Sequence, residues 1–230
     1  MLSIIIPAYN EEKRIGNKLK DYYDYFSCFV KKFEIIVVTD GCTDKTVEVV
    51  KSFRKKNIIS LDFPEKLGKG GGIKEGFRIA KGDIIGFVDA DESVTPKDFN
   101  EMVEKIKHYD CVVASRRTKY SKILEKQPLR RRILGRGYNI LVNLLFGLGV
   151  KDTQCGAKVF RKVLIKIILK DVHTTGYSFD IDVLWKIKRN KFTIMEHPVT
   201  WMHMKEGQFN VRKHMFRMFV EVMKLRLRDL

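Results

Sequence analysis

The chain has 230 residues, of which 44% are hydrophobic and 32% are charged, and its formal net charge is +17. This length fits one large domain or two small ones, and the composition is that of a globular protein, which excludes a disordered chain. The large positive charge indicates an anionic partner, which could be nucleic acid, a phosphorylated metabolite or an acidic membrane surface.

The amino terminus predicts a strand at once. Residues 2–6 are apolar except for Ser3 and run into Pro7 without a basic segment or a cleavage site, so no signal peptide is expected. No window reaches the roughly 18 uninterrupted apolar residues of a transmembrane helix, so we expect only peripheral contact with a membrane. The four cysteines are widely spaced without a CxxC pair, which argues against zinc or a disulfide framework and favours the cytoplasmic side.

The first half of the chain alternates predicted strands and helices. Strands are predicted at residues 2–6, 34–38, 58–61, 84–88 and 111–114, with a helical segment between each pair. This alternation predicts an α/β fold with a mostly parallel sheet flanked by helices. Right-handed crossovers would bring Tyr9, Asp40, Asp89 and Asp91 together at the carboxyl edge of the sheet, where such sheets bind ligands.

Two acids, Asp89 and Asp91, end the apolar run of residues 84–88. Neighbouring carboxylates repel each other, and a divalent cation that also binds substrate phosphates removes this repulsion. The sequence therefore predicts a metal site at this strand end, the alternative being a solvated acidic turn.

The pattern changes after Ser115. Residues 116–136 contain nine Lys or Arg and one acid, and they lead into an apolar segment at 133–146. A strand at 157–160, helices from about 162 and 179, and a last strand at 193–199 are predicted next. A basic, methionine-rich amphipathic helix is predicted from about residue 209 to the end.

Four motifs resemble those of family 2 glycosyltransferases in order and spacing: residues 7–12 (PAYNEE), 38–44 (VTDGCTD), 88–91 (VDAD) and 152–156 (DTQCG). Within that family the chain is most similar to the dolichyl-phosphate sugar synthases, over about residues 2–205. The resemblance implies the GT-A fold, a Rossmann-like nucleotide-binding sheet extended by acceptor-binding elements. It also implies inverting transfer of a hexose from a nucleotide-sugar to a polyprenyl or dolichyl monophosphate at the membrane surface.

On this resemblance, residues 1–208 form one glycosyltransferase domain, followed by the helix of residues 209–230. Residues 1–115 are the nucleotide-sugar half and residues 116–208 the acceptor half. The implied cofactor is Mg²⁺ or Mn²⁺ held by Asp89 and Asp91, and the implied donor contacts are Pro7, Ala8, Tyr9, Glu11, Thr39, Asp40, Lys69, Gly70, Asp89, Ala90, Asp91, Gln154 and Lys205.

The choice of donor is the least determined feature. The glycine-rich run at 68–72 resembles glucosyl enzymes more than mannosyl enzymes and favours UDP-glucose over GDP-mannose. Thr39, however, stands where the family usually has an aspartate that reads the base. Tyr9 could instead be a core aromatic, and Lys69 a solvated charge.

The acceptor side is expected to be basic. A lipid monophosphate bonds well to the forked guanidinium group and is already ionised at neutral pH, so it needs no strong general base. The resemblance assigns Arg117 and Arg131 as the catalytic phosphate contacts, with Arg132 and Asp180 beside them. The alternatives are a solvated basic loop for the arginines and a helix cap for Asp180.

Two other function classes remain as alternatives. A nucleotidyltransferase shares this sheet and metal site, but it would carry a glycine-rich basic loop directly after the first strand. A nucleic-acid-binding protein would fit the charge, yet no nucleic-acid-binding motif is present and the basic residues collect beside apolar runs. We therefore expect no nucleic-acid partner, and the sequence does not predict the oligomeric state.

The last helix is expected to reach the lipid. Residues 211–230 combine basic side chains with Met, Phe, Leu and Val, a composition suited to the interface of an anionic membrane. Residues 133–146 could form a second membrane contact. The alternative is that these apolar faces pack on the sheet or on a second subunit.

Overall fold

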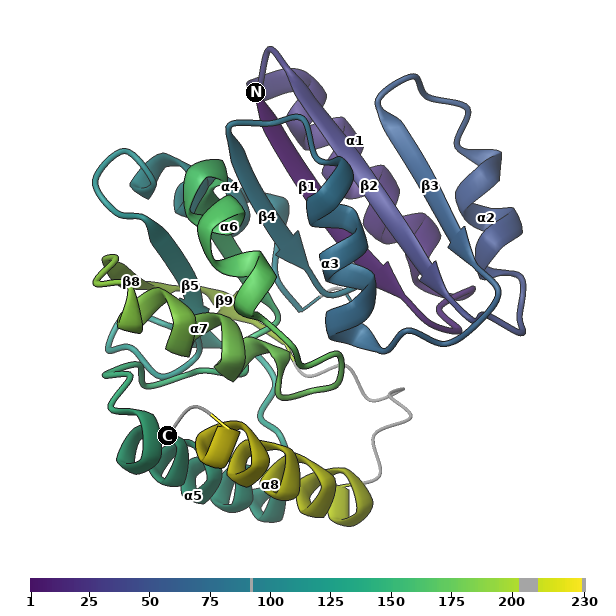
Figure 1. Ribbon diagram of the computed structural model, residues 1–230. Helices are drawn as coiled ribbons and strands as arrows, with labels where there is room; N and C mark the ends of the chain where they lie inside the picture. Colours follow the sequence, from purple (N-terminus) through teal and green to yellow (C-terminus); the bar gives the residue numbers. More distant parts are fainter. Residues whose placement is uncertain (92, 203–210, 229–230) are drawn as a thin grey trace.

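The computed structural model describes residues 1–91, 93–202 and 211–228 (Figure 1). Its centre is a seven-stranded sheet in the order β3-β2-β1-β4-β7-β5-β8. The strands are β1 (Leu2–Ala8), β2 (Phe33–Asp40), β3 (Ile58–Phe63), β4 (Ile84–Val88), β5 (Cys111–Ser115), β7 (Ala157–Arg161) and β8 (Ile194–Pro198). A small second sheet pairs β6 (Lys122–Ile123) with β9 (Thr200–Trp201).

The prediction of a mostly parallel α/β sheet is confirmed, with one reversed strand. β7 pairs antiparallel with both β4 and β5, whereas the other strand pairs of the large sheet are parallel. Because β7 runs in the opposite direction, the segment just before it approaches the edge where β4 ends. The loop of residues 152–156 therefore meets the acidic pair.

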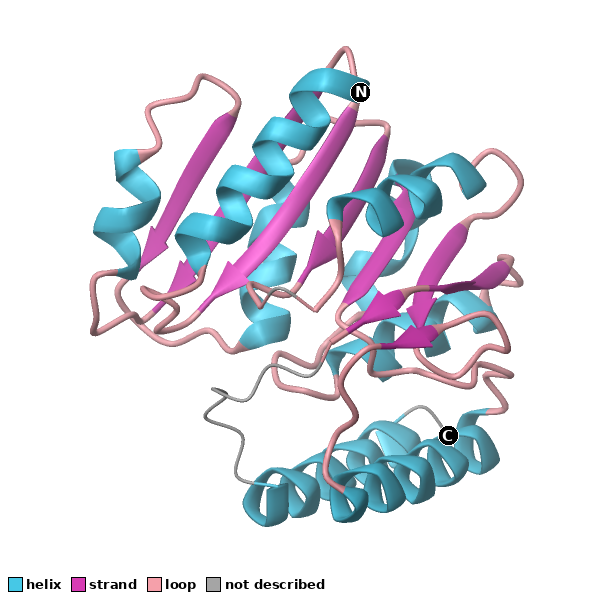
Figure 2. Ribbon diagram, turned by 180° about the vertical axis from the view of Figure 1, so that it is seen from behind, coloured by secondary structure: helices cyan, strands magenta, loops and turns pink. Residues whose placement is uncertain are grey.

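Helices cover both faces of the sheet (Figures 1 and 2). One core cluster includes side chains of α3, α5, α6, α7 and α8, and the other includes side chains of α1, α2 and α4. The helices are α1 (Ile15–Phe29), α2 (Thr46–Ser52), α3 (Lys69–Ile79), α4 (Pro96–Lys105), α5 (Leu129–Phe146), α6 (Lys162–Ile168), α7 (Phe179–Arg189) and α8 (Val211–Arg228), with a short 3-10 turn at Leu169–Asp171.

The two covered faces explain the apolar strands. In β1, Ile4 and Ile6 belong to one core cluster and Ile5 to the other, and all three are fully buried. Alternate side chains of a strand point to opposite faces, so a strand covered on both sides needs a continuous apolar run.

The glycine-rich run is helical from Lys69 onward. Gly70, Gly71 and Gly72 form the first turn of α3. The N–H groups of Gly70 and Gly71 donate to the carbonyl oxygen of Thr175 at 2.8 and 3.2 Å. A Cβ on Gly70 would lie 2.5 Å from Cβ of Phe179, so the glycine lets α3 begin in contact with the start of α7.

The predicted C-terminal amphipathic helix is present as α8, which lies alongside α5 below the sheet (Figures 1 and 2). Met218, Val222 and Leu225 of α8 are buried and join the same core cluster as α5 and α7. These three side chains of α8 are thus used in packing, whereas Phe219 and Leu227 are exposed. Of the helices in the described ranges, none combines the length and apolar character needed to cross a bilayer.

Candidate active site

The acidic pair lies at the carboxyl end of β4, as predicted. The backbone N–H of Asp89 donates to Gly156 O at 2.8 Å, which ties the strand end to the 152–156 loop. A Cβ on Gly156 would collide with the Asp89 carboxylate, so glycine there permits the close approach. Asp91 is held by Ser93, whose N–H and hydroxyl both donate to its Oδ1.

Lys69 supplies the positive charge beside this pair. Its Nζ lies 2.7 Å from Oδ1 of Asp89, so the ammonium stands where a cation would meet that carboxylate. Burial and the nearby Asp91 carboxylate raise the pKa of Asp89, although Lys69 opposes them. An oxygen-rich site that already attracts one cation suits a hard divalent ion.

A divalent cation would be held here by two carboxylates together with groups from outside the chain. Within the described residues no cluster of three or more His, Cys, Asp and Glu has the arrangement of a complete ligand set. Mg²⁺ commonly uses one or two carboxylates plus substrate phosphates, so Asp89 and Asp91 fit a metal that arrives with a diphosphate.

The loop after β1 contributes to the same edge. Ala8 is buried, Pro7 is half-buried and Tyr9 is more exposed, with Nζ of Lys66 3.4 Å from its ring centroid. Tyr9 is therefore a surface aromatic and not a core residue. Glu11 pairs with Arg14 at 2.6 Å; burial raises its pKa, and the charges of Asp91 and Asp89 add to the rise, so it lies near the acidic pair.

Two of the expected donor contacts, Thr39 and Asp40, lie at the end of β2. Both carboxylate oxygens of Asp40 accept backbone N–H groups, from Leu67 and Gly68, so Asp40 shapes the loop before α3. Thr39 is buried and donates its hydroxyl to Oδ1 of Asp62 at 2.9 Å. Asp62 on the neighbouring strand thus supplies a carboxylate beside Thr39.

Three other expected donor contacts have different outcomes. Ala90 is buried between the two acids, and Gly70 is a packing residue whose N–H is already bonded to Thr175. The side-chain nitrogen of Gln154 is buried without a hydrogen-bond partner among the described residues, which is the state expected of a group that awaits a ligand. Lys205 lies outside the described residues.

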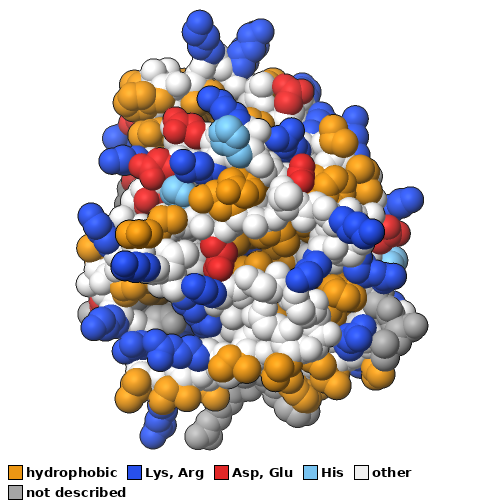
Figure 3. All heavy atoms as spheres, turned by 90° about the vertical axis from the view of Figure 1, so that its left-hand side faces the viewer, with side chains coloured by type: hydrophobic (Ala, Val, Ile, Leu, Met, Phe, Trp, Pro, Cys, Tyr) orange, Lys and Arg blue, Asp and Glu red, His pale blue; other side chains and the backbone are white. Residues whose placement is uncertain are grey.

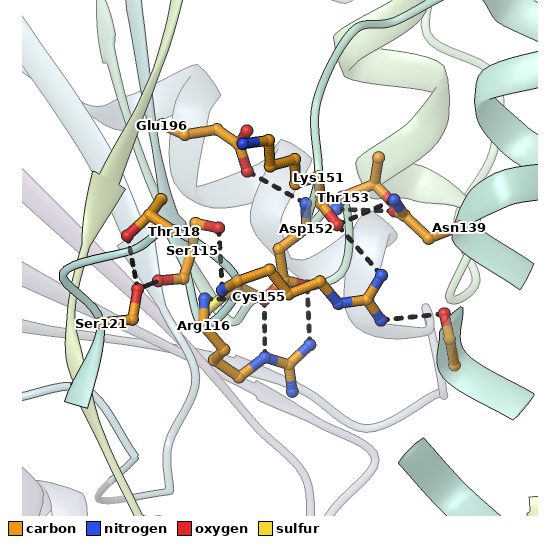
Figure 4. Close-up of polar contacts among 12 residues, drawn as sticks. Ser115, Arg116, Thr118, Ser121, Asn139, Lys151, Asp152, Thr153, Cys155 and Glu196 are labelled. Atoms are coloured by element: carbon orange, nitrogen blue, oxygen red, sulfur yellow. Dashed lines mark hydrogen bonds and ion pairs between the residues drawn. The ribbon is translucent and has the colours of Figure 1, made fainter. Parts of the chain in front are cut away.

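The basic side of the site centres on Arg116, which directly follows β5 (Figure 4). Its Nε donates to Oδ2 of Asp152 and its Nη2 donates to Oδ1, both at 2.8 Å. Its backbone N–H also donates to Oδ2 of Asp152. The guanidinium carbon lies 5.3 Å from the ring centroid of Trp201. Arg116 is therefore a charge fixed in position by a carboxylate and an aromatic ring.

The arginines expected to hold phosphate do not share one environment. Arg131 lies in the first turn of α5 and is half-buried. Its pKa is lowered, first by burial and then by Arg116. Arg117 instead donates to Lys151 O and Gly135 O at 3.0 and 2.9 Å and anchors α5, while Arg132 is half-exposed on that helix.

Asp180 lies in the protein interior. Its side chain is 2% exposed, forms a hydrogen-bonded ion pair with Lys158, and lies 3.8 Å from Nζ of Lys69. The N-cap residue of α7 is Ser178, and Asp180 lies in the first turn of the helix. Asp180 is thus an interior carboxylate beside Lys158 and Lys69, and its assignment to acceptor binding stays a prediction.

Comparison with known proteins places the chain in a family. The model of glycosyl transferase family 2 matches residues 3–169. The chain belongs to this family and is a glycosyltransferase. It is 32% identical to a dolichyl-phosphate beta-glucosyltransferase of Dictyostelium discoideum, over 100% of the chain and 75% of that protein. It is 30% identical to the enzyme of the same name from Saccharomyces cerevisiae, over 87% of the chain and 66% of that protein.

Solved structures agree with the GT-A fold of this glycosyltransferase. Glucosyl-3-phosphoglycerate synthase from Mycobacterium tuberculosis, in complex with Mn²⁺, UDP and glucosyl-3-phosphoglycerate, superposes with a TM-score of 0.72. The sequence identity is 18%, over 98% of the chain and 79% of that protein. The predicted family and fold are thus confirmed.

Two charged residues of the glycosyltransferase site were not predicted to have roles. Arg116 was treated only as part of a basic run, although it directly follows a buried strand on the same edge as Asp89. Lys158 is fully buried in β7, between apolar neighbours. A lysine inside an apolar strand was a usable signal, since a buried charge needs a partner.

Proposed function

We propose that the chain transfers a hexose from a nucleotide-sugar, UDP-glucose in preference to GDP-mannose, to a dolichyl or other polyprenyl monophosphate. The observation that carries this proposal is the loop of residues 152–156, which is bonded to the acidic pair through Gly156 and to the guanidinium of Arg116 through Asp152. A nucleotide diphosphate with its cation suits one side, and a phosphate acceptor suits the other. The names of the two relatives support the same reaction.

The donor would lie along the ends of β1, β2 and β4. Asp89 and Asp91 would hold Mg²⁺ or Mn²⁺, which would offset the charge of the leaving nucleotide diphosphate. Tyr9 offers an exposed ring to the nucleobase, and the unpartnered amide of Gln154 is available to the sugar or its phosphate. Lys205 remains a proposed diphosphate contact.

The acceptor needs positioning and no strong base. Its phosphate is ionised at neutral pH, so an oxygen can attack the anomeric carbon directly and displace the nucleotide with inversion. Arg131 would hold that phosphate, with Arg132 beside it, and Arg116 would add a fixed positive charge. Arg117 would act through α5, because its guanidinium is bonded to the backbone of Gly135 and Lys151.

The chain is accordingly divided into a donor-binding part, residues 1–115, and an acceptor-binding part, residues 116–208. Helix α5 belongs to the second part. A hollow of about 550 Å³ beside it is lined by three apolar side chains and by polar and basic ones: Ile140, Leu144 and Val150, with Asn139, Asn143, Arg117, Arg136 and Lys151. Such a hollow suits the first units of a polyprenyl chain.

The outer face of α5 is the surface best suited to a membrane. Leu129, Ile133, Ile140 and Leu144 are all more than half exposed and recur at helical spacing. The lower edge of Figure 3 has hydrophobic side chains close to Lys and Arg. Apolar side chains can enter the acyl boundary while cations meet anionic headgroups. We therefore place peripheral attachment, on the cytoplasmic face, chiefly on α5 and only secondarily on α8.

A transfer assay with purified protein tests the reaction. Radiolabelled UDP-glucose or GDP-mannose is incubated with dolichyl phosphate, and dolichol without its phosphate serves as the matched control. We expect label in the lipid phase from UDP-glucose with dolichyl phosphate, and none with dolichol. If only GDP-mannose gave label in the lipid phase, the assignment of UDP-glucose as donor would be overturned. Equal transfer to dolichol would overturn the assignment of a lipid monophosphate as acceptor.

A further inference from the structure

Lys69 lies between two carboxylates at unequal distances. Its Nζ is 2.7 Å from Oδ1 of Asp89 and 3.8 Å from Oδ2 of Asp180. The first distance is a hydrogen-bonded ion pair, and the second is too long for a hydrogen bond. Burial lowers the pKa of Lys69, but the charges of Asp89 and Asp180 more than compensate, so the pKa is raised.

Asp180 is held in place from behind. Lys158 in β7 is fully buried, pairs with Oδ1 of Asp180, and also donates to Cys155 O at 3.1 Å. The other oxygen, Oδ2, faces Lys69. Asp180 therefore offers Lys69 a fixed second acceptor in the interior.

The backbone around Lys69 is fixed as well. Gly70 packs against Phe179, and the N–H groups of Gly70 and Gly71 are bonded to Thr175 O. These contacts join the start of α3 to the start of α7, and they place Lys69 next to Asp180. A change of partner thus requires movement of the flexible lysine side chain alone.

We propose that Lys69 is a mobile counter-ion with two positions, and that Asp180, held by Lys158, is the positioning residue that receives it. In the first position the ammonium neutralises Asp89 before the donor binds. When a divalent cation takes Asp89, the ammonium moves to Asp180, because two cations on one carboxylate oxygen repel each other. The inference rests on the proposed function in one respect only, the cation at Asp89.

Direct Mn²⁺ binding tests this exchange without an activity measurement. The free Mn²⁺ signal is followed by electron paramagnetic resonance in the presence of UDP, for four proteins. They are the wild type, Asp180→Asn, Lys69→Met, and the variant with both changes.

In the wild-type background, Asp180→Asn removes the second position of the lysine, so we expect Mn²⁺ affinity to fall about tenfold. In the Lys69→Met background the same change should alter the affinity by less than about twofold, because no ammonium has to move. An equal loss in both backgrounds would mean that Asp180 is merely structural and would overturn the inference. No loss in the wild-type background would also overturn it.

A second variant covers the case in which Asp180→Asn does not fold, since it leaves Lys158 buried without its partner. Changing Asp180→Asn and Lys158→Met together removes the pair and leaves a neutral interior, which buried sites often tolerate. The same tenfold loss is expected, and unchanged affinity overturns the inference. If the wild type itself binds no Mn²⁺, the inference falls, and transfer measured in EDTA shows whether the proposed reaction survives it.

Discussion

Arg116 and Asp152 form a two-pronged ion pair, with Nε and Nη2 of the guanidinium each 2.8 Å from one carboxylate oxygen. The pair joins the end of β5 to the loop that leads into β7, and Asp152 is almost completely buried. A charge fixed in this way needs no further ordering when a ligand binds, which is an advantage for a site that must hold two phosphate-bearing molecules.

This pair predicts a pH dependence of stability. Burial raises the pKa of Asp152, but Arg116 outweighs it and the pKa lies below its ordinary value. The stabilisation is therefore fully present above about pH 4 and is lost as the pH falls through the pKa of the folded state. Asp152→Asn should lower the free energy of unfolding by about 3 kcal/mol at neutral pH.

Urea denaturation at a series of pH values checks this. The difference between the wild type and Asp152→Asn should shrink below about pH 4, where the wild-type carboxyl takes up a proton. A difference that stays constant down to about pH 3 would contradict the assigned cause.

The acidic pair gives a second prediction. Asp91→Ala should abolish transfer and the effect of Mn²⁺ on donor binding, because one of the two carboxylates available to the cation is lost. The fold should be retained, since Asp91 is bonded only to the adjacent Ser93 in the described part of the chain. Thermal shift with UDP-glucose, with and without Mn²⁺, measures the binding. Wild-type activity in EDTA would remove the metal from the mechanism.

The third prediction concerns the contact between the start of α3 and the start of α7. Gly70→Ala places a Cβ 2.5 Å from Phe179 and should destabilise the protein by about 1–3 kcal/mol, besides displacing Lys69. Gly137→Ala is the matched control, because a Cβ on that helical glycine meets nothing within 4 Å. It should be neutral or stabilise by up to about 1 kcal/mol. Equal thermal stability of the two variants would refute the packing argument.

The fourth prediction concerns the lipid surface. Leu144, 79% exposed on α5, should contribute to binding of anionic vesicles, and Leu144→Glu should weaken co-sedimentation about tenfold or more. Val163, 66% exposed on α6, provides the control, and Val163→Glu should leave vesicle binding unchanged. Binding should also weaken with added salt, given the basic side chains beside the apolar stripe. If both variants bind alike, α5 is not the docking face.

Local patterns predicted the strands well. Apolar runs such as residues 84–88 are long enough to identify a strand with both faces covered. The position of the two acids at the end of this strand could be predicted because parallel strands bind ligands at their carboxyl ends. The reversed direction of β7 could not be predicted, because strand direction depends on the path of the connection and not on the residues of the strand.

The candidate site was predicted less completely, for a similar reason. Asp89 and Asp91 are close in sequence, so the pair can be recognised from the sequence alone. The partners of Asp180 come from β7 and α3, which are distant along the chain. The packing role of Gly70 could not be predicted, because a run of glycines is equally consistent with an open loop and with two helices in close contact. Only the position of Phe179 distinguishes the two.

The placement of β7 also has a consequence for how the polypeptide reaches this structure. β4 and β5 leave the ribosome before the strand that separates them, so the middle of the sheet stays incomplete until residue 161 has been synthesised. Until then β4 has an unpaired edge toward the centre, and pairing between distant segments forms slowly. A nascent chain stopped before β7 should therefore expose two unpaired, aggregation-prone strand edges. At this length we expect the polypeptide to depend most on a chaperone.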